Sequence, residues 1–253
     1  MSLSRINRFL RRTGYSIVRN DYSPEHSDIF CAEERSFSDA YARVEGYSLT
    51  SYERMFALHK AVQYISRAHI PGDMVECGVW RGGSSMMVAH TLLQCGDTDR
   101  RLYLYDTYEG MPAGSENDRD YGGRSSDEIF SPEKRADNLD NLAISIEEVS
   151  ANLKGTKYPQ DKIVLVKGKV EETIPHQSPE QIALLRLDTD FFESTYHELV
   201  HLWPRVVSRG VVIIDDYGHW KGARMAVDRF FEEQGLSVLL QRVDYTARLL
   251  IKS

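Results

Sequence analysis

Short apolar runs alternate with longer amphipathic segments from residue 73 onward, and this alternation restricts the possible folds more than any other feature of the sequence. A strand, a helix and then another strand favour parallel pairing, so we predict an α/β fold with helices on both faces of a mainly parallel, seven-stranded sheet. The last two predicted strands are joined by too few residues for a helical crossover, and we expect them to be antiparallel. The predicted strands cover residues 73–77, 102–105, 163–166, 182–187, 211–214, 237–241 and 247–251.

Two predicted helices begin with a capping box, in which the first side chain and the fourth bind each other's backbone N–H groups. Thr50 pairs in this way with Glu53, and Ser145 pairs with Glu148. The predicted helices cover residues 50–69, 84–94, 145–153, 194–206 and 222–234.

The chain has 253 residues, which suits one large domain. We interpret residues 1–70 as a helical extension that serves substrate and oligomer contacts, and residues 71–253 as the main part of the domain. A net charge of -7 argues against a nucleic-acid partner, because binding to phosphates needs a basic surface. No apolar run approaches the roughly 18 residues of a membrane span, so we expect no stable membrane insertion.

The N-terminal residues 1–18 interleave apolar side chains with arginines and lack the continuous apolar stretch of a signal peptide. They predict a surface helix or a contact in a homo-oligomer; weak attraction to an anionic membrane surface is the alternative. Three cysteines, Cys31, Cys77 and Cys95, cannot all pair and fit no zinc motif, which favours a reduced, cytoplasmic setting.

Residues 112–138 are rich in glycine, serine and acidic or amide side chains and show no apolar period. A loop of this length is usually functional or disordered. It follows a predicted strand on the side where ligands bind in open α/β sheets. We therefore predict either a mobile lid over the substrate or a plain disordered insertion.

A glycine-rich turn joins the first predicted strand to the next helix, in the sequence VECGVWRGGSS of residues 75–85. Gly78 would let a ligand approach the backbone closely. Ser84 and Ser85 lie at the helix start, where free N–H groups favour a carboxylate. The glycine spacing does not fit a dinucleotide fingerprint, so the turn indicates another nucleotide-like ligand, or a tight structural turn.

Asp106 ends the second predicted strand. An acidic side chain at this position can bind the hydroxyls of a ribose, as in other nucleotide-binding α/β folds. The alternative is an aspartate that caps its own loop.

Three carboxylates end two neighbouring predicted strands, with Asp188 after one and Asp215 and Asp216 after the next. Parallel strands share a carboxyl edge, and carboxylates that converge there repel one another unless a cation lies between them. Oxygen ligands select Mg²⁺, Mn²⁺ or Ca²⁺. We predict a metal site; simple capping of the strand ends is the alternative.

Two further polar residues lie close to these carboxylates in the sequence. Asp190 is expected to support the site rather than to ligate the metal. His219 is a candidate general base near neutral pH, although a loop histidine is more often only solvated.

The chain resembles the macrocin O-methyltransferase family, which methylates hydroxyls of deoxysugars on natural products. The likeness covers roughly residues 45–235 and is strongest in separated blocks. These blocks are SYERMFAL (51–58), VECGVWRGGSS (75–85), YDTYEGMP (105–112), LLRLDTDFFEST (184–195), GVVIIDDYG (210–218) and AVDRF (226–230).

The resemblance implies a Rossmann-like class I methyltransferase fold with S-adenosylmethionine as the methyl donor. It implies a Mg²⁺ site made by Asp188, Asp215 and Asp216, with Asp188 and His219 as the candidate catalytic residues. The acceptor would be a sugar hydroxyl of a small, glycosylated molecule. The residues implied to surround the cofactor are Ser51, Glu76, Gly78, Val79, Trp80, Ser84, Asp106, Gly168, Val170, Glu171 and Asp188.

The sequence departs from its relatives at a few positions. The distant catechol O-methyltransferases have a catalytic lysine where this chain has Phe191, so Asp188 or activation by the metal must replace that base. The usual Asp-Gly-Asp is Asp-Thr-Asp here, and Phe192 stands where tyrosine is common. Methylation of a phenolic or catechol hydroxyl, or a non-catalytic protein that binds the cofactor, are the alternative functions.

Overall fold

The structure is a computed structural model that describes residues 32–130 and 143–253. Two compact units are distinguished, Met1–Ser36 and Phe37–Ser253, and the second contains the elements discussed below apart from the start of the first helix, residues 32–36. The predicted features at residues 1–18, at Cys31 and at residues 131–138 lie outside the described part of the chain. Cys77 and Cys95 are free thiols.

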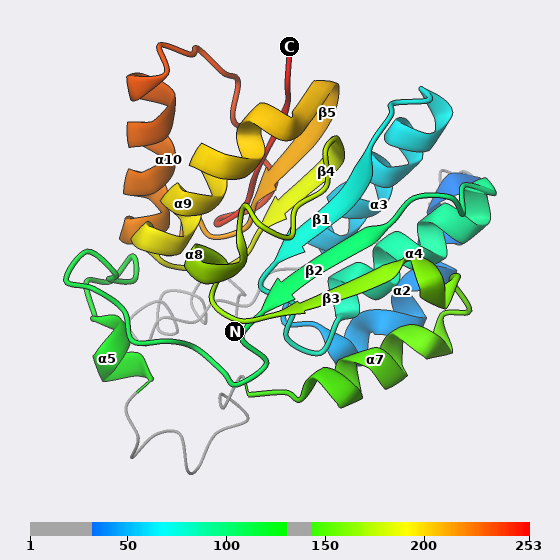
Figure 1. The fold of residues 1–253 in the computed structure, drawn as a ribbon, viewed down its shortest axis with the longest axis horizontal. Coiled ribbons are helices and arrows are strands. Elements are labelled where there is room, and N and C mark those ends of the chain that lie inside the picture. The colour runs from blue at the N-terminus through cyan, green and yellow to red at the C-terminus, as the bar shows by residue number, and fades with distance from the viewer. Residues whose placement is uncertain (1–31, 131–142) are drawn as a thin grey trace, which may run out of the picture. The chain divides into compact units, whose positions relative to one another are not determined.

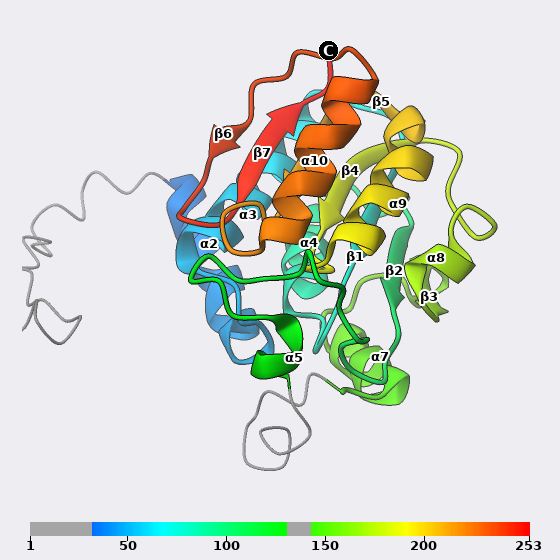
Figure 2. The ribbon, with the colours of Figure 1, turned by 90° about the vertical axis from the view of Figure 1, so that its left-hand side faces the viewer.

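In the described residues, seven strands form one sheet in the order β3-β2-β1-β4-β5-β7-β6, which confirms the predicted fold class; Figure 1 labels β1 to β5, and Figure 2 also labels β6 and β7. The pairs from β3 to β5 are all parallel, whereas β7 is antiparallel to both β5 and β6. The strands are β1 (Asp73–Cys77), β2 (Leu102–Asp106), β3 (Ile163–Lys167), β4 (Ile182–Leu187), β5 (Val206–Ile214), β6 (Gln241–Arg242) and β7 (Arg248–Ile251).

Helices cover both faces of the sheet, because successive side chains of each buried strand point to opposite sides. Met74 packs into one core, which it shares with α2, α3, α4 and α7, while its neighbour Val75 packs into the other, against α9 and α10. Figure 2 shows α9 and α10 side by side. The helices are α2 (Ala32–Val44), α3 (Tyr52–Arg67), α4 (Gly83–Cys95), α5 (Ser126–Ile129), α7 (Ile146–Gly155), α8 (Val170–Thr173), α9 (Phe192–Leu202) and α10 (Lys221–Glu233).

The predicted cap of α3 is wrong by one residue. Ser51 is the N-cap, and its hydroxyl accepts a hydrogen bond from the Arg54 N–H. The Thr50 hydroxyl instead accepts a hydrogen bond from Arg186. The predicted N-cap of α7 is confirmed, because the Ser145 hydroxyl accepts from the Glu148 N–H. Two residues with equivalent capping chemistry stand side by side at α3, and a contact from a distant strand decides between them.

The largest differences between predicted and observed bounds occur at three other elements. Helix α9 begins two residues earlier than predicted and ends at Leu202, where a 3₁₀ turn (Trp203–Arg205) follows. Strand β5 begins at Val206 rather than at residue 211. The predicted strand 237–241 shrinks to the two residues of β6, because only Gln241 and Arg242 pair with β7 although apolar residues precede them.

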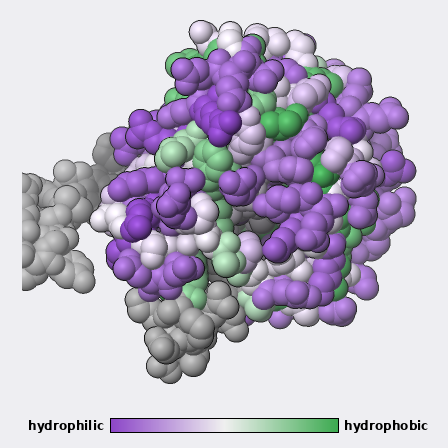
Figure 3. Space-filling model, turned by 60° about the vertical axis from the view of Figure 1, so that its left-hand side comes forward, coloured by the Kyte–Doolittle hydropathy of each residue, from purple (hydrophilic) through white to green (hydrophobic). Residues whose placement is uncertain are grey.

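Hydrophilic residues cover most of the molecular face shown in Figure 3, and apolar residues are exposed there in smaller patches. Among the described helices, none has both the length and the apolar character that crossing a membrane requires.

Candidate active site

A cavity of about 860 Å³ opens at the carboxyl ends of the parallel strands. This is where ligands bind in open α/β sheets, and the volume is within the range of small-molecule sites. Its walls come from the turns that follow β1, β2, β3, β4 and β5, together with residues 110–130. The cavity therefore brings together segments that are far apart in the sequence.

The glycine-rich turn forms one wall of this cavity. Gly78 has a φ of +84°, and a Cβ placed there would overlap the carbonyl oxygen of Asp188. Gly82 has a φ of +85° and is the N-cap of α4. Trp80 and Ser84 line the cavity beside them. Glycine is thus required at position 78, both by its backbone conformation and by the close approach of β4.

Asp106 lies at the cavity but also holds the turns around it. One of its carboxylate oxygens accepts hydrogen bonds from the N–H groups of Val79 at 2.7 Å and Trp80 at 3.1 Å. The other accepts from the Tyr108 N–H at 2.8 Å. The loop-capping role considered for this residue is therefore present, and a contact with a ribose stays a prediction.

The remaining residues predicted to surround the cofactor divide into two groups. Gly168, Val170 and Glu171 line the cavity at the end of β3. Ser51 and Glu76 are not among its lining residues. Ser51 donates a hydrogen bond to Asp244 at 2.9 Å, and Glu76 is buried beneath the glycine-rich turn.

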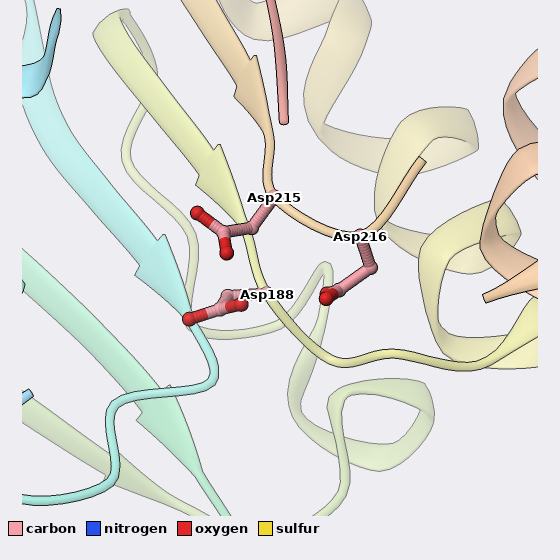
Figure 4. A group of neighbouring side chains, drawn as sticks. All are labelled: Asp188, Asp215 and Asp216. Carbon is pink, nitrogen blue, oxygen red and sulfur yellow. The ribbon is translucent and has the colours of Figure 1, made fainter. Parts of the chain in front are cut away.

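The three predicted metal ligands converge at the ends of the neighbouring strands β4 and β5 (Figure 4). Asp188, Asp215 and Asp216 each offer a carboxylate oxygen, and these oxygens lie within 4.8 Å of one another. All three residues line the cavity, and Asp215 and Asp216 are buried. Three hard oxygen donors at this separation suit a divalent cation.

Arg186 connects these carboxylates and was not among the site residues predicted from the sequence. Its guanidinium is buried and donates to Glu76 at 2.7 Å, to Asp188 at 2.6 Å and to Asp215 at 2.7 Å. A charged residue within an otherwise apolar buried strand, IALLRL, was the signal that could have revealed it, because such residues are almost always paired.

Arg54, from the first turn of α3, is the second cation at the site. It pairs with Asp215 and, at 3.2 Å, with Asp244 of the turn between β6 and β7. Around the three predicted metal ligands, the two guanidiniums of Arg54 and Arg186 thus face six carboxylates. The carboxylates are Glu76, Asp188, Asp190, Asp215, Asp216 and Asp244.

Burial and an excess of carboxylates over guanidiniums raise the pKa values of several of these carboxyl groups. Burial raises the pKa of Asp188 and Asp216 well above the ordinary aspartate value, and neighbouring carboxylates add to the shift. Burial and the charge of Asp188 raise the pKa of Asp190, which is hydrogen-bonded to Asp216, to about 7. The site thus favours an added positive charge, and the donor set fits a divalent metal ion.

His219 lies at the cavity, with Nδ1 3.1 Å from the hydroxyl of Tyr245. Partial burial lowers the pKa of His219, so its ring is neutral at pH 7 and able to accept a proton. Phe191, at the position of the lysine in the catechol enzymes, also lines the cavity and offers no base.

The described part of the predicted lid, up to residue 130, is docked onto the site. Buried Asp118 accepts a hydrogen bond from the Phe192 N–H, at the start of α9, at 2.8 Å. Its other oxygen accepts from the N–H and hydroxyl of Ser115 at 2.6 and 2.7 Å. Asp120 also pairs with Trp220 in an isolated antiparallel bridge. These contacts hold the segment in place as one wall of the cavity.

Comparison with protein families matches residues 7–252 to Macrocin-O-methyltransferase (TylF). The chain is 32% identical to the 8-demethyl-8-(2,3-dimethoxy-alpha-L-rhamnosyl)-tetracenomycin-C 4'-O-methyltransferase of Streptomyces olivaceus, over 79% of this chain and 73% of that protein. It is 27% identical to the Mycinamicin III 3''-O-methyltransferase of Micromonospora griseorubida, over 85% and 82%.

Solved structures agree with these sequence relationships. The O-methyltransferase NovP superposes with a TM-score of 0.71 and 27% identity, covering 82% of each chain. CalS11, a calicheamicin methyltransferase, shares the fold with a TM-score of 0.58 and 18% identity over 88% of this chain and 93% of its own. The resemblance found in the sequence blocks is confirmed.

Proposed function

We propose that this chain, which belongs to the macrocin O-methyltransferase family, methylates a sugar hydroxyl of a glycosylated small molecule. As a member of this family, the chain is an S-adenosylmethionine-dependent O-methyltransferase. The sugar acceptor is supported above all by the similarity to the Streptomyces olivaceus enzyme, whose name describes a 4'-O-methyltransferase of a rhamnosyl-tetracenomycin.

We assign the cofactor to the half of the cavity at β1, β2 and β3. The N–H groups at the start of α4, beside Ser84, suit the carboxylate of S-adenosylmethionine. Asp106 is the proposed partner of its ribose, and residues 168–171 lie where its adenine would bind. Glu76 would support the cofactor site indirectly, because its carboxylate accepts hydrogen bonds from Ser85 and Arg186.

We assign a divalent metal ion, Mg²⁺ or another, to Asp188, Asp215 and Asp216. The ion would supply a Lewis acid that lowers the pKa of an acceptor hydroxyl and fixes its position. The converging oxygens and the excess of buried carboxylates over guanidiniums support this assignment. Arg186 holds Asp188 and Asp215 in place from below.

The proposed reaction is a single in-line displacement. The bond between the sulfonium sulfur and its methyl carbon breaks as the bond between that carbon and the acceptor oxygen forms. The hydroxyl proton passes to a neighbouring base, for which neutral His219 and the carboxylate of Asp188 are the candidates. The residues contribute mainly by holding donor and acceptor in line and by stabilising the charge that develops on the acceptor oxygen.

The function is tested by incubating the protein with Mg²⁺, S-adenosylmethionine bearing a deuterated methyl group, and rhamnosides with either alkyl or aromatic aglycones. We expect a product whose tandem mass spectrum places the label on the sugar fragment, and no product in excess EDTA. Label found on a phenolic aglycone would favour the alternative acceptor class. Full turnover in EDTA would overturn the metal assignment. Homo-oligomer formation stays a prediction, which light scattering of the full chain would test.

A further inference from the structure

A group of apolar side chains lines the cavity directly beside the carboxylates. Phe191 and Trp220 are buried at its centre and pack with Ala223 of α10. Met111, Ile129 and Phe130, from the docked segment, complete the group, which we call the aromatic wall. All of these residues except Ala223 line the cavity.

The wall is ordered around the indole of Trp220. The Phe130 ring lies nearly parallel to it, with centroids 6.0 Å apart, and the Phe191 ring is perpendicular at 5.4 Å. The Trp220 side chain is hydrogen-bonded to Asp190, and its backbone N–H donates to Asp216 at 2.9 Å. The aromatic wall therefore lies directly next to the proposed metal ligands.

A second set of rings continues from the wall to the surface. The ring centroid of His219 lies 5.5 Å from that of Trp220. The ring centroids of Tyr121 and Tyr245 lie 5.4 and 5.9 Å from that of His219. Tyr121 is 67% exposed and Tyr245 is 54% exposed. Large aromatic rings exposed beside a cavity commonly mark a binding surface.

The wall offers few hydrogen bonds to a ligand. Met111, Ile129, Phe130 and Phe191 have no side-chain donor, and the Trp220 indole already bonds to Asp190. A second sugar ring bound there would leave buried hydroxyls without partners, which is costly. A flat, uncharged ring would instead bury its faces against these side chains.

We propose that the aromatic wall is a binding site for a planar aromatic aglycone carried by the methylated sugar. This inference rests on the proposed function, because it places the sugar hydroxyl at Asp188, Asp215 and Asp216 and the aglycone beside them. The acceptor would thus be an aryl glycoside, held by the wall and by Tyr245, which also lines the cavity. The bridge between Asp120 and Trp220 keeps the wall in place.

The experiment measures binding rather than turnover, by calorimetry of the full chain with Mg²⁺ and S-adenosylhomocysteine. The probes are 2-naphthyl α-L-rhamnopyranoside, methyl α-L-rhamnopyranoside and free 2-naphthol. Stacking on the wall should make the naphthyl glycoside bind about tenfold more tightly than the methyl glycoside, and 2-naphthol should compete with it.

Phe130→Ala and Tyr245→Ala, each of which removes a ring that lines the cavity, should reduce this preference at least about threefold and leave the affinity for S-adenosylhomocysteine unchanged. Tyr196→Ala, which alters a ring of α9 that does not line the cavity, is the matched control and should keep the preference. Circular dichroism verifies that each variant is folded.

Equal affinity for the two glycosides, or a preference that survives in both variants, overturns the inference. Failure of the proposed function has a different result, since both glycosides would then bind with the expected preference yet receive no methyl group on the sugar. The calorimetric comparison decides the aromatic site in either case.

Discussion

The guanidinium of Arg186 donates a hydrogen bond to the Oδ1 atom of Asp215 at 2.7 Å, with both side chains almost fully buried. The two residues lie on the neighbouring parallel strands β4 and β5 or directly after them. The same guanidinium reaches Asp188 and Glu76, so one cation links three carboxylates at the cavity. Asp188 and Asp215, two of the proposed metal ligands, are thus positioned by a residue that is not itself a ligand.

Replacing Arg186 should destabilise the fold strongly. In Arg186→Gln, buried carboxylates lose their cation, and removing one partner of a buried pair costs about 3–5 kcal/mol. Urea unfolding followed by circular dichroism measures the loss. Arg229→Gln removes an exposed pair on α10 and should leave the midpoint unchanged. Equal midpoints for the two variants would show that Arg186 is dispensable.

Metal binding should be visible in thermal stability. An ion that binds only the folded state at 100 times its Kd adds about 2.7 kcal/mol of stability, equivalent to a Tm shift of about 5–10 °C. Mg²⁺ should raise the Tm of the wild type in this way and have little effect on Asp216→Asn. Asp161→Asn, an exposed aspartate in the turn before β3, is the control. A full shift in Asp216→Asn contradicts the assignment of that ligand.

Gly78→Ala should weaken cofactor binding and lower the stability of the fold. The new Cβ would overlap the backbone of Asp188, and the positive φ alone costs about 1–3 kcal/mol. We expect calorimetry to show loss of S-adenosylmethionine binding and urea unfolding to show lower stability. Gly155→Ala, where a Cβ meets nothing within 4 Å, is the matched control. Normal cofactor affinity in Gly78→Ala would mean that the backbone can shift there without effect.

Asp118→Ala should release the docked segment from the start of α9. The carboxylate holds the Phe192 N–H and Ser115, and both contacts are lost. Because this segment lines the acceptor side, kcat/KM for the acceptor should fall while the affinity for S-adenosylmethionine stays the same. Limited proteolysis should cut residues 111–130 faster than in the wild type. Asp127→Asn, exposed on α5, should behave as the wild type in both assays.

His219 should determine the acid limb of the pH-rate profile if it takes the acceptor proton. Burial lowers the pKa of His219 below its ordinary value of 6.5. The neutral ring is therefore present at pH 7, and kcat/KM should fall only below pH 6.5. His219→Gln should remove this limb and reduce the rate about 10²–10⁴-fold. An unchanged limb in the variant would leave Asp188 as the base.

The bounds of the strands illustrate what could be read locally. Strands β1 and β4 were predicted with their observed bounds, because a short apolar run flanked by turn residues carries its signal within a few positions. Strand β6 was predicted too long, since pairing depends on a partner strand and not on the apolar letters before it. The cap of α3 failed for a similar reason, because Thr50 is engaged by Arg186 from β4.

The α/β architecture, the glycine-rich turn and the convergence of Asp188, Asp215 and Asp216 could be predicted from the residues alone. These follow from periodicity and from the rule that parallel strands end at one edge. Two features emerged only from the packed fold: Arg186 and Arg54 compensate these carboxylates, and Asp118 docks the segment that carries Phe130 beside Trp220. Such contacts join residues from separate elements, and their geometry arises only when the elements pack together.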